Sequence, residues 1–453
     1  MKVAVLGGGV TGLTAAWRLS AAGHSVRLLE AAPRLGGSVR TEVSGGWTAE
    51  AGPNSFQETP EVAALVADLG LAAERVEASP SAQNRYIVLD GKLAALPAPS
   101  SMADFMATRV LSLGAKWKVG REFSRKPAER TADVSVAQFM GEHFGQEVVD
   151  RVVQPFVSGI YAGDPDRLSA RHAFPKIWEA ERTMGSLLSA GAESARKRRA
   201  EGLPPAPALI SFRAGAQALT DALGSRLPRG SVELSAEVRS IGPGSGARWR
   251  VEWSGPDGHG EGQFDWVVSA LPAGALASLR IGPKGATPLG GLSAIEHPPV
   301  ASVFVGYRRD KILHALDGFG VLVPAAEKRS ILGVIFSSSL FEGRAPAGHV
   351  ALTVLVGGAL QPEVALLPSP RLENKVLSDL EALLGARGKP AFLRQTLWPR
   401  AIPQYNLGYE LHLDSMAACE GSNPGFLIGG NARDGISIPD CVRSGVSLAK
   451  RVS

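Results

Sequence analysis

The stretch that decides the fold is VAVLGGGVTG at residues 3–12, which leads through a short apolar segment into SVRLLE at 25–30. Its apolar first half predicts a buried strand, and the glycines that follow predict a tight turn. The apolar spacing over 12–22 predicts a helix that Gly23 ends. Residues 26–29 predict a second strand, so the stretch as a whole predicts a βαβ unit.

The spacing Gly7-x-Gly9-x-x-Gly12 between the strand and the helix indicates a dinucleotide-binding turn. The first glycine permits the tight turn, the second lets the backbone approach a pyrophosphate, and the third lets the helix pack closely on the strand. The helix N-terminus then offers free N–H groups and the positive end of its dipole to the phosphates. Glu30 ends the second strand, where an acid holds a ribose hydroxyl, and this argues against NADP.

The residues after Glu30 favour FAD over NAD. Gly36 and Gly37 follow at the distance where flavoproteins continue the dinucleotide motif, and glycine lets loop backbone approach a longer cofactor. Arg34, in the same loop, either reaches the pyrophosphate or the adenine or forms a surface salt bridge. The turn Gly52-Pro53-Asn54-Ser55 is a further segment that could line the isoalloxazine ring, although turn chemistry alone does not decide this.

A second glycine-rich turn precedes a predicted helix at residues 429–438. In a flavoprotein such a segment returns to the cofactor and offers N–H groups to the flavin N1–C2=O edge, which stabilises the anionic reduced ring. The alternative is that Asp434 or Asp440 binds a metal ion, but neither has partner ligands, and we predict no metal site.

Composition excludes several classes of protein. Glycine accounts for 53 of 453 residues, about 12% against a usual value near 7%, but without the G-X-Y period of collagen. The apolar fraction of 45% and the net charge of +5 suit a folded protein of two or three domains that meets an anionic small molecule or an anionic membrane surface. The sequence lacks the dense stripe of basic residues that is typical of a nucleic-acid-binding protein. Two cysteines, no signal-peptide pattern and no long apolar run favour a cytosolic protein that spans no membrane.

The remaining chain changes character twice. Residues 100–200 carry amphipathic helical patterns in which apolar side chains alternate with lysine and arginine, and the proline-rich stretch EGLPPAPA at 201–208 closes this helical insertion. Strand patterns return at 232–239, 248–253 and 264–270, and a β-rich block with hairpin turns extends over 299–307 and 320–356.

These motifs together resemble the protoporphyrinogen oxidase family, flavoenzymes of haem biosynthesis within the amine-oxidase-like FAD superfamily. The resemblance extends along essentially the whole chain. The segments that carry it are GGGVTGL at 7–13, EAAPRLGGSVRT at 30–41, AGPNSF at 51–56, NRYI at 84–87, SGIYAGDPDRLS at 158–169, GVIFSSSLFEGRAP at 333–346, IPQYNLGY at 402–409 and GISIPDCVRSG at 435–445. The first two mark the superfamily, and the middle and last ones point to this family.

The resemblance implies a fold of class α/β plus α+β with three parts. A discontinuous Rossmann-like FAD-binding domain takes 1–88, 206–280 and 392–453. A β-rich substrate domain takes 89–99 and 281–391, and an all-helical membrane-associating domain takes 100–205. The helical insertion and the proline-rich linker agree with this layout independently of the resemblance.

The resemblance also implies the site residues. FAD binds non-covalently, one per chain, and its expected contacts are Gly7, Gly8, Gly9, Val10, Thr11, Gly12, Glu30, Ala31, Arg34, Gly36, Gly37, Ser38, Gly52, Pro53, Asn54, Ser55, Val238, Trp398, Gly430, Asn431, Ile436, Ser437 and Ile438. Arg85 pairs a propionate of the substrate through its planar fork, unless it is a structural ion pair. The Gly159 carbonyl accepts pyrrole N–H groups. Leu322 and Phe336 sandwich the macrocycle, with an ordinary core position as the alternative for each.

The function implied is oxidation of protoporphyrinogen IX to protoporphyrin IX by a flavin oxidase, with O2 as acceptor and hydrogen peroxide as product. Coproporphyrinogen III is the alternative substrate on the same scaffold. A flavin amine oxidase is a second hypothesis, with Tyr405, Tyr409 and Trp398 available for an aromatic cage but Arg85 expected to repel amines. A non-enzymatic dinucleotide-binding or membrane-scaffold protein is a third hypothesis, and it predicts a purified protein that is colourless and stays colourless when FAD is added.

The expected partners and location follow from the same resemblance and from charge. They are a porphyrinogen, O2 and an anionic membrane surface, with no nucleic acid and with a homodimer as the family's usual state. The protein is expected in the cytoplasm, bound peripherally to the cytoplasmic face of the membrane through the basic, amphipathic 100–200 region.

Overall fold

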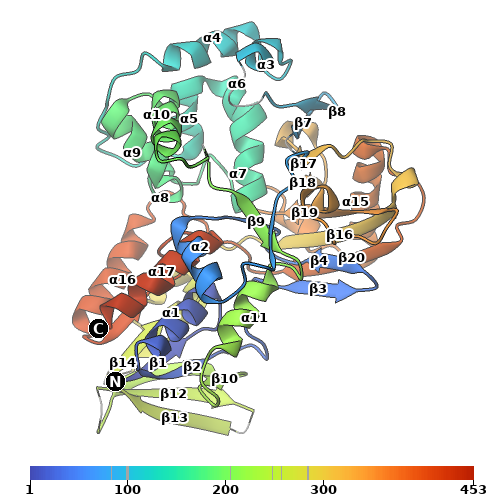
Figure 1. Ribbon diagram of the computed structural model, residues 1–453. Helices are drawn as coiled ribbons and strands as arrows, with labels where there is room; N and C mark the ends of the chain where they lie inside the picture. The colour runs from blue at the N-terminus through green and yellow to red at the C-terminus, as the bar shows by residue number, and fades with distance from the viewer. Residues whose placement is uncertain are drawn as a thin grey trace.

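The computed structural model divides visibly into three layers (Figure 1). A parallel sheet that holds both chain ends lies at one end, a seven-stranded sheet lies in the middle, and a group of helices lies at the other end. The structure describes residues 1–82, 84–97, 102–204, 206–246, 248–256, 258–282 and 285–452. Each expected domain segment, and the proline-rich stretch 201–208, therefore includes at least one residue outside the described ranges.

The parallel sheet is the Rossmann-like core that the opening motif predicts. Its five strands, in spatial order, are β10 (Val232–Glu233), β2 (Ser25–Leu29), β1 (Lys2–Leu6), β14 (Trp266–Ser269) and β21 (Phe426–Ile428). All neighbouring pairs run parallel. Because the strands come from three distant stretches of sequence, the sheet is discontinuous, as the resemblance implies.

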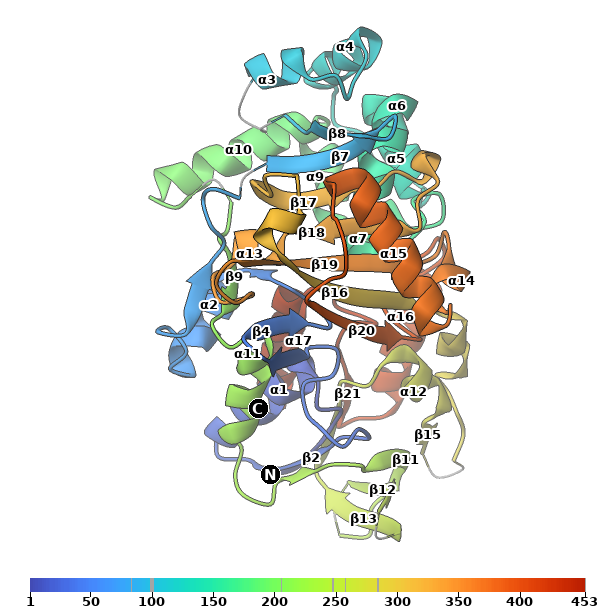
Figure 2. The same ribbon diagram turned by 90° about the vertical axis from the view of Figure 1, so that its right-hand side faces the viewer.

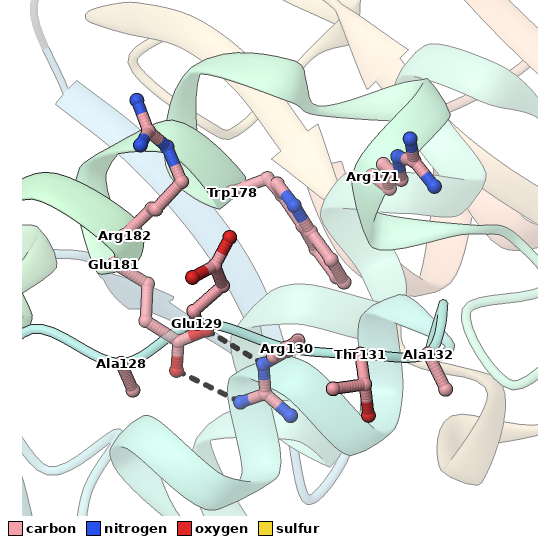
Figure 3. A pocket seen from close by; sticks show the side chains of 9 residues that line it. All are labelled: Ala128, Glu129, Arg130, Thr131, Ala132, Arg171, Trp178, Glu181 and Arg182. Carbon is pink, nitrogen blue, oxygen red and sulfur yellow. Dashed lines mark hydrogen bonds and ion pairs between the residues drawn. The ribbon is translucent and has the colours of Figure 1, made fainter.

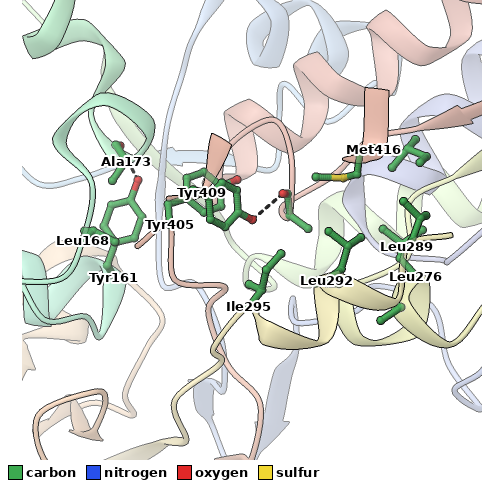
Figure 4. Packing of buried hydrophobic residues seen from close by; sticks show 14 of the residues in the cluster. Tyr161, Leu168, Ala173, Leu276, Leu289, Leu292, Ile295, Tyr405, Tyr409 and Met416 are labelled. Carbon is green, nitrogen blue, oxygen red and sulfur yellow. Dashed lines mark hydrogen bonds between the residues drawn. The ribbon is translucent and has the colours of Figure 1, made fainter. Parts of the chain in front are cut away.

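Helices cover one face of this sheet and a second, smaller sheet covers the other. The helices are α1 (Val10–Ala21), α2 (Pro60–Asp68), α11 (Gln217–Ser225) and α17 (Ile438–Arg451), whose apolar residues form one core with β1 and β2. The opposite face packs against a four-stranded sheet, β11 (Glu237–Pro243), β12 (Trp249–Gly255), β13 (Gly258–Phe264) and β15 (Arg280–Ile281), and against α12 (Ala273–Ser278) and α16 (Glu410–Ser422). Figure 4 shows part of this second core, which extends from Met416 to Tyr161.

The seven-stranded sheet is the β-rich block of the sequence. Its strands, in spatial order, are β20 (Phe392–Trp398), β16 (Val300–Arg308), β19 (His349–Gly357), β18 (Ile331–Ile335), β17 (Gly318–Leu322), β7 (Asn84–Leu89) and β8 (Lys92–Ala95). Helix α15 (Ser369–Leu384) covers one face of this sheet, where it shares a hydrophobic core with valines of the strands, Val356 among them. The sheet membership of β7 and β20 differs from the expected division of the chain, which assigned both strands to the FAD-binding part.

The helical layer contains α3 (Met102–Ala107), α4 (Leu113–Glu122), α5 (Val136–Phe144), α6 (Gln146–Val148), α7 (Gln154–Tyr161), α8 (Ala170–Ala173), α9 (Pro175–Met184) and α10 (Leu187–Ala200). Figures 1 and 2 place α3 and α4 at the extreme end, and α7 alongside β17 and β18. No helix in the part of the chain that the structure describes is both long and apolar enough to cross a membrane.

A buried charge network holds the helical layer together. The ring nitrogens of His143 lie 3.0 Å from a Glu122 oxygen and 3.1 Å from a Glu181 oxygen. Arg130 donates to both oxygens of Glu181, at 2.6 and 2.8 Å. Because a buried carboxylate without partners is costly, this network ties α4, α5 and α9 into one arrangement.

The other strands connect the layers. They are β3 (Thr41–Ser44) and β4 (Trp47–Glu50), which form a hairpin, and β5 (Phe56–Gln57), β6 (Arg75–Glu77) and β9 (Leu209–Phe212), which form a three-stranded sheet. Two short helices, α13 (Ser337–Leu340) and α14 (Pro362–Ala365), flank β18 and β19. Trp47 packs against Phe304 and Phe392, so the hairpin joins the seven-stranded sheet to the FAD-binding part.

Candidate cofactor and substrate site

The glycine-rich turns meet at the carboxyl edge of the parallel sheet, where ligands bind in open α/β folds. The Gly7 N–H donates to Leu29 O at 2.8 Å, and Gly36 N–H donates to Gly8 O at the same distance. From the other side, Gly429 N–H donates to Ser269 O at 2.9 Å. Three turns that are far apart in sequence therefore lie side by side, as predicted.

Glu30 is held in place by backbone N–H groups at this edge. One carboxylate oxygen accepts from Gly8 N–H at 2.5 Å, and the other accepts from Ala32 N–H at 2.7 Å. Ala236 N–H donates to the Glu30 carbonyl at 2.8 Å, which brings the segment leading to Val238 to the same place. The carboxylate is partly exposed and thus available to a ribose.

The space around Gly9 and Gly12 shows whether this turn can accept a dinucleotide, because the motif needs close packing at Gly12 and open space at Gly9. A methyl group on Gly12 would lie 1.9 Å from the Gly7 carbonyl oxygen, so helix and turn are in direct contact there. A methyl group on Gly9 would meet no atom within 4 Å. Gly9 has an ordinary extended conformation, φ −77°, so its backbone does not demand glycine. The open space at Gly9 is where a pyrophosphate fits.

Arg34 closes the loop after Glu30 by binding its backbone. This role is neither of the two that the sequence left open, which were a contact to the pyrophosphate or adenine and a surface salt bridge. The guanidinium donates to the carbonyls of Leu35, Val39 and Gly37, at 2.9, 3.2 and 2.5 Å. Burial, with Arg40 nearby, lowers the pKa of Arg34 from its ordinary value. Arg34 thus shapes the loop that carries Gly36 and Gly37 rather than standing free as a phosphate ligand.

The C-terminal turn brings a second helix N-terminus beside the first. A methyl group on Gly445 of α17 would lie 2.6 Å from Thr11 O of α1, which shows how closely the two helices pack. Cys441 lies in the first turn of α17, and burial raises the pKa of its thiol to about 11. The middle of α17 therefore packs along the first turns of α1, and the turn before α17 borders Thr11 through Gly430.

The polar side chains of this turn serve the backbone. Ser437 caps α17 by accepting from Asp440 N–H at 3.2 Å, and Asp440 reaches back to the Ser437 hydroxyl. Asp434 accepts from Gly430 N–H at 3.0 Å and from the hydroxyl of Ser444. Among the described residues, no group of His, Cys, Asp and Glu side chains is arranged to hold a metal ion.

The remaining predicted contacts lie between this edge and the seven-stranded sheet. Trp398, at the end of β20, donates from Nε1 to Ala51 O at 2.7 Å, which ties that strand to the turn at 52–55. Asn54 is buried and accepts from the hydroxyl of Thr353 at 3.0 Å. A methyl group on Gly52 would lie 2.0 Å from Ser38 O, so this turn also packs against the first cofactor loop.

Tyr405 and Tyr409 do not form an aromatic cage for an amine. Both side chains are buried, and the rings stack on each other with centroids 4.3 Å apart. The Tyr405 hydroxyl donates to Asn431 O at 2.6 Å, and that of Tyr409 donates to Ala432 O at 2.7 Å. Figure 4 shows the two rings lying against each other. Their polar ends hold the C-terminal turn, which leaves neither ring face open to a substrate.

The predicted substrate residues lie on and beside the face of the seven-stranded sheet that α7 covers. Gly159 is in the last turn of α7, and a methyl group there would lie 2.8 Å from Leu322 Cδ2 on β17. Arg85 on β7 lies opposite Gly320 of β17. Because Gly320 and Leu322 are two residues apart in the strand, Arg85 and Leu322 are on the same face of the sheet. Its exposed guanidinium lies 5.8 Å from the Phe319 ring centroid and forms no ion pair with any described residue. The structural ion pair considered for Arg85 is thus not seen.

Phe336 is where the structure departs from the prediction. Its side chain is fully buried in the core beneath α15, with its ring 5.5 Å from that of His314. Gly333 pairs with Leu322, so Ile335 shares the face of Leu322, and Phe336 follows on the opposite face. The core interpretation therefore replaces the sandwich for Phe336.

Two further residues that the sequence reasoning did not name lie on the same face as Leu322. Ile335 and Leu355 flank Gly333 on the side of α7, since Leu355 pairs directly with Gly333. Both are partly exposed aliphatic side chains. The two-residue periodicity of β18 and β19 contains this information, but only once the face of Leu322 is known.

The enclosed spaces of the helical layer are separate from this edge. One hollow of about 230 Å³ lies between Arg130, Arg171, Trp178 and Arg182 (Figure 3). Another, of about 430 Å³, lies beside Lys118 and Gln138. No predicted site residue lines either hollow, so the cofactor site rests on the glycine turns described above.

Comparisons with known proteins agree with this geometry. The sequence matches the family of flavin containing amine oxidoreductases over residues 10–453. It is 33% identical to "Protoporphyrinogen oxidase 2, chloroplastic/mitochondrial" of Arabidopsis thaliana, over 100% of this chain and 93% of that one. It is 28% identical to coproporphyrinogen III oxidase of Bacillus subtilis, over 98% and 96%.

A solved structure shares the fold. It comes from Exiguobacterium sp. 255-15 and is described as a proposed protoporphyrinogen oxidase, with a TM-score of 0.82 and 24% identity over 100% of this chain and 98% of that one. The family match and the glycine turns together identify the cofactor as FAD.

Proposed function

The chain belongs to the flavin containing amine oxidoreductase family, and on that premise we propose that it oxidises a porphyrinogen to a porphyrin in haem biosynthesis. The names of its relatives support this substrate class. We propose protoporphyrinogen IX as the substrate and O2 as the electron acceptor, with hydrogen peroxide released. We also propose a three-part division of the chain, with β7 and β20 counted with the seven-stranded sheet, and the homodimer that the resemblance implies.

The observation that carries the choice of substrate is the lack of charge around Leu322. Helix α7 and strands β17, β18 and β19 contain no lysine or arginine. Arg85 stands at the edge of this apolar surface. Protoporphyrinogen carries two vinyl groups where coproporphyrinogen carries two more propionates, and each buried propionate needs a cation. A single arginine beside an apolar face suits the less charged molecule.

The protein's own residues bind and orient the macrocycle. When bound, FAD supplies the two-electron redox chemistry. Arg85 pairs a propionate and fixes the register of the ring on the sheet. Gly159 lies in the last turn of α7, where helix carbonyls lack intrahelical partners, so its carbonyl can accept pyrrole N–H groups. Leu322, Ile335 and Leu355 support the ring from the sheet side. We identify no acid–base pair, so positioning carries most of the catalysis.

Membrane association is a further part of the proposal. Four apolar side chains are exposed to solvent at this end of the molecule: Met106 on α3, Leu113 and Trp117 on α4, and Phe123 directly after α4. Arg121 lies over the Trp117 ring, at 4.8 Å from its centroid. Exposed aromatic and aliphatic side chains among basic ones suit an anionic bilayer surface. We therefore propose that this end of the molecule lies on the cytoplasmic face of the membrane.

Anaerobic flavin reduction tests the proposed substrate. We expect protoporphyrinogen IX to bleach the flavin absorbance at 450 nm or so, with coproporphyrinogen III at least about tenfold slower, because two further carboxylates must be desolvated. Arg85→Leu should raise KM at least about tenfold with FAD retained, since a charge-assisted pair contributes about 1.5–3 kcal/mol. Arg308→Leu, on the same sheet but paired with Asp310 at the surface, is the matched control.

Other outcomes would decide against parts of the proposal. Equal rates with the two porphyrinogens would contradict the choice between them. No reduction by either, together with reduction by an alkyl amine, would favour an amine oxidase. We do not expect the latter, because the Tyr405 and Tyr409 hydroxyls already bind the C-terminal turn.

A further inference from the structure

The hydroxyl groups of Tyr405 and Tyr409 bind the C-terminal turn at three points. Tyr405 donates to Asn431 O at 2.6 Å and accepts from Gly435 N–H at 3.0 Å. Tyr409 donates to Ala432 O at 2.7 Å. Together these bonds span the whole turn between β21 and α17.

The two tyrosines are themselves held rigidly. Their rings stack at 4.3 Å and both are at most 3% exposed. The segment that carries them is anchored to the helical layer, since Ser169 N–H donates to Tyr405 O at 2.8 Å and Leu407 N–H donates to Arg167 O at 2.9 Å. Burial raises the pKa of both hydroxyls well above 10, so they remain neutral donors at any pH the cell reaches.

The turn that they hold lies at the cofactor. A methyl group on Gly430 would come within 3.8 Å of the Thr11 hydroxyl oxygen and of Ala270, so the turn borders the first residues of α1. It leads directly into the N-terminus of α17, capped by Ser437. The direction of the N–H groups from 431 to 438 therefore depends on where the tyrosine hydroxyls place this backbone.

We propose that Tyr405 and Tyr409 are positioning residues that set the reduction potential of the bound flavin by fixing the backbone of residues 431–438. Backbone N–H groups and a helix N-terminus stabilise negative charge only when they are fixed in direction before the charge develops. Reduced flavin carries more negative charge than oxidised flavin, so a fixed turn raises the potential. The inference rests on FAD binding and not on the identity of the substrate.

The test compares single hydroxyl deletions in the holoenzyme. Tyr405→Phe and Tyr409→Phe keep the stacked rings and remove one hydroxyl each. Tyr161→Phe is the matched control, because its buried hydroxyl also donates to a carbonyl, Ala173 O at 2.7 Å, but in the helical layer. The potential is measured by equilibrating the flavin anaerobically with a reference dye, which needs no porphyrinogen.

We expect Tyr405→Phe to shift the ratio of reduced to oxidised flavin at least tenfold toward the oxidised form, which is about 30 mV for a two-electron couple. Tyr409→Phe should shift it in the same direction by less, since it removes one bond instead of two. Tyr161→Phe should leave it unchanged. An unchanged or raised potential in Tyr405→Phe, with only weaker FAD binding or a lower Tm, would show a structural role and overturn the inference. A shifted potential in a protein inactive on porphyrinogens would overturn the proposed function instead.

Discussion

At the scale of single residues, the two later glycines of the cofactor motif do different things. Gly12 is required by the fold, because any side chain there collides with the Gly7 carbonyl at 1.9 Å. Gly9 is required only by a ligand, because the protein leaves the space beside it open. The motif predicts these two roles from spacing, and the structure shows the packing at Gly12 and the open space at Gly9 directly.

Alanine substitutions separate them experimentally. Gly9→Ala should change the free energy of unfolding of the apoprotein by less than about 1 kcal/mol, because φ −77° suits alanine. It should weaken FAD binding at least about tenfold, or 1.4 kcal/mol, because the methyl group takes the pyrophosphate's place. Gly12→Ala should destabilise the apoprotein itself by about 1–3 kcal/mol. Thermal unfolding without FAD and FAD titration by fluorescence measure the two effects. Equal loss of apoprotein stability in both variants would contradict this division.

At the scale of elements, one carboxylate joins α16 to the strand and the helix that flank the cofactor turn. Glu420 accepts from Ile428 N–H at 2.6 Å and pairs with Arg433 and Arg451 at 2.9 and 2.8 Å. Burial alone would raise the pKa of Glu420, but the Arg451 hydrogen bond, the Ile428 N–H and Arg433 together hold that pKa below its ordinary value of 4.5. The group is therefore ionised and bonded throughout the neutral range.

Because the pKa of Glu420 is lowered in the folded protein, its carboxylate stabilises the fold at neutral pH and loses this effect on acidification. A carboxylate with a depressed folded-state pKa stabilises the fold fully above the unfolded pKa, near 4.5, and loses that contribution as pH falls through the folded value. Glu420→Gln should lower the free energy of unfolding by about 2 kcal/mol at pH 7. The difference from the native protein should shrink below pH 4.5.

The control for Glu420→Gln lies on the same helix. Glu410→Gln removes a carboxylate whose partner, Arg171, is exposed, so the cost should stay below about 1 kcal/mol. Urea unfolding at pH 7 and at pH 4 measures both variants. A Glu420→Gln penalty that stays constant or grows on acidification would be inconsistent with the lowered pKa.

A helix contact at the same scale bears on substrate access. Gly159 on α7 faces Leu322, and a methyl group there would lie 2.8 Å from the end of that flexible side chain. Gly159→Ala should therefore fold and keep FAD, because Leu322 can turn aside at a cost of about 1 kcal/mol. It should raise KM for the porphyrinogen several-fold without changing the flavin spectrum. An unchanged KM would place the macrocycle away from α7.

At the scale of the whole molecule, the exposed apolar side chains of α3 and α4 lie at the opposite end from the parallel sheet. Helices α3 and α4 are farthest from the parallel sheet in both views (Figures 1 and 2). If that end rests on a bilayer, the parallel sheet and its cofactor edge lie on the side away from lipid. Changes at α4 should then affect membrane binding without affecting FAD.

Vesicle co-sedimentation tests this arrangement. The double variant Leu113→Ser, Trp117→Ser should reduce binding to phosphatidylglycerol vesicles at least about tenfold, since each exposed apolar side chain contributes about 1.5–3 kcal/mol when buried. Leu411→Ser on α16, which is 73% exposed against 76% for Leu113, should bind as the native protein does. Binding that survives the α4 variant, or that Leu411→Ser also abolishes, would contradict membrane contact through α4.

Much of the fold could be predicted because it depends on local patterns. The βαβ unit at 2–29, the helical layer and the terminal strand and helix are all where periodicity and glycine placement indicate. The division between sheets was harder, since β7 joins the seven-stranded sheet by pairing with β17, and β20 joins it by pairing with β16, both far away in sequence. Local spacing does not reveal which sheet a strand joins.

The sequence by itself determined the cofactor turns, since a strand, a spacing of glycines and an acid impose backbone geometry within a few residues of one another. Only the tertiary structure decided which side chains share the face of Leu322 and which hold the C-terminal turn. Phe336 and Ile335 face opposite sides because they are adjacent in an extended segment, but only the pairing of β18 with β17 decides that Ile335 is the one that shares the face of Leu322. Tyr405 and Asn431 are 26 residues apart, yet packing joins them by a hydrogen bond. Faces and long-range bonds depend on how distant segments pair, and that pairing is a property of the whole fold.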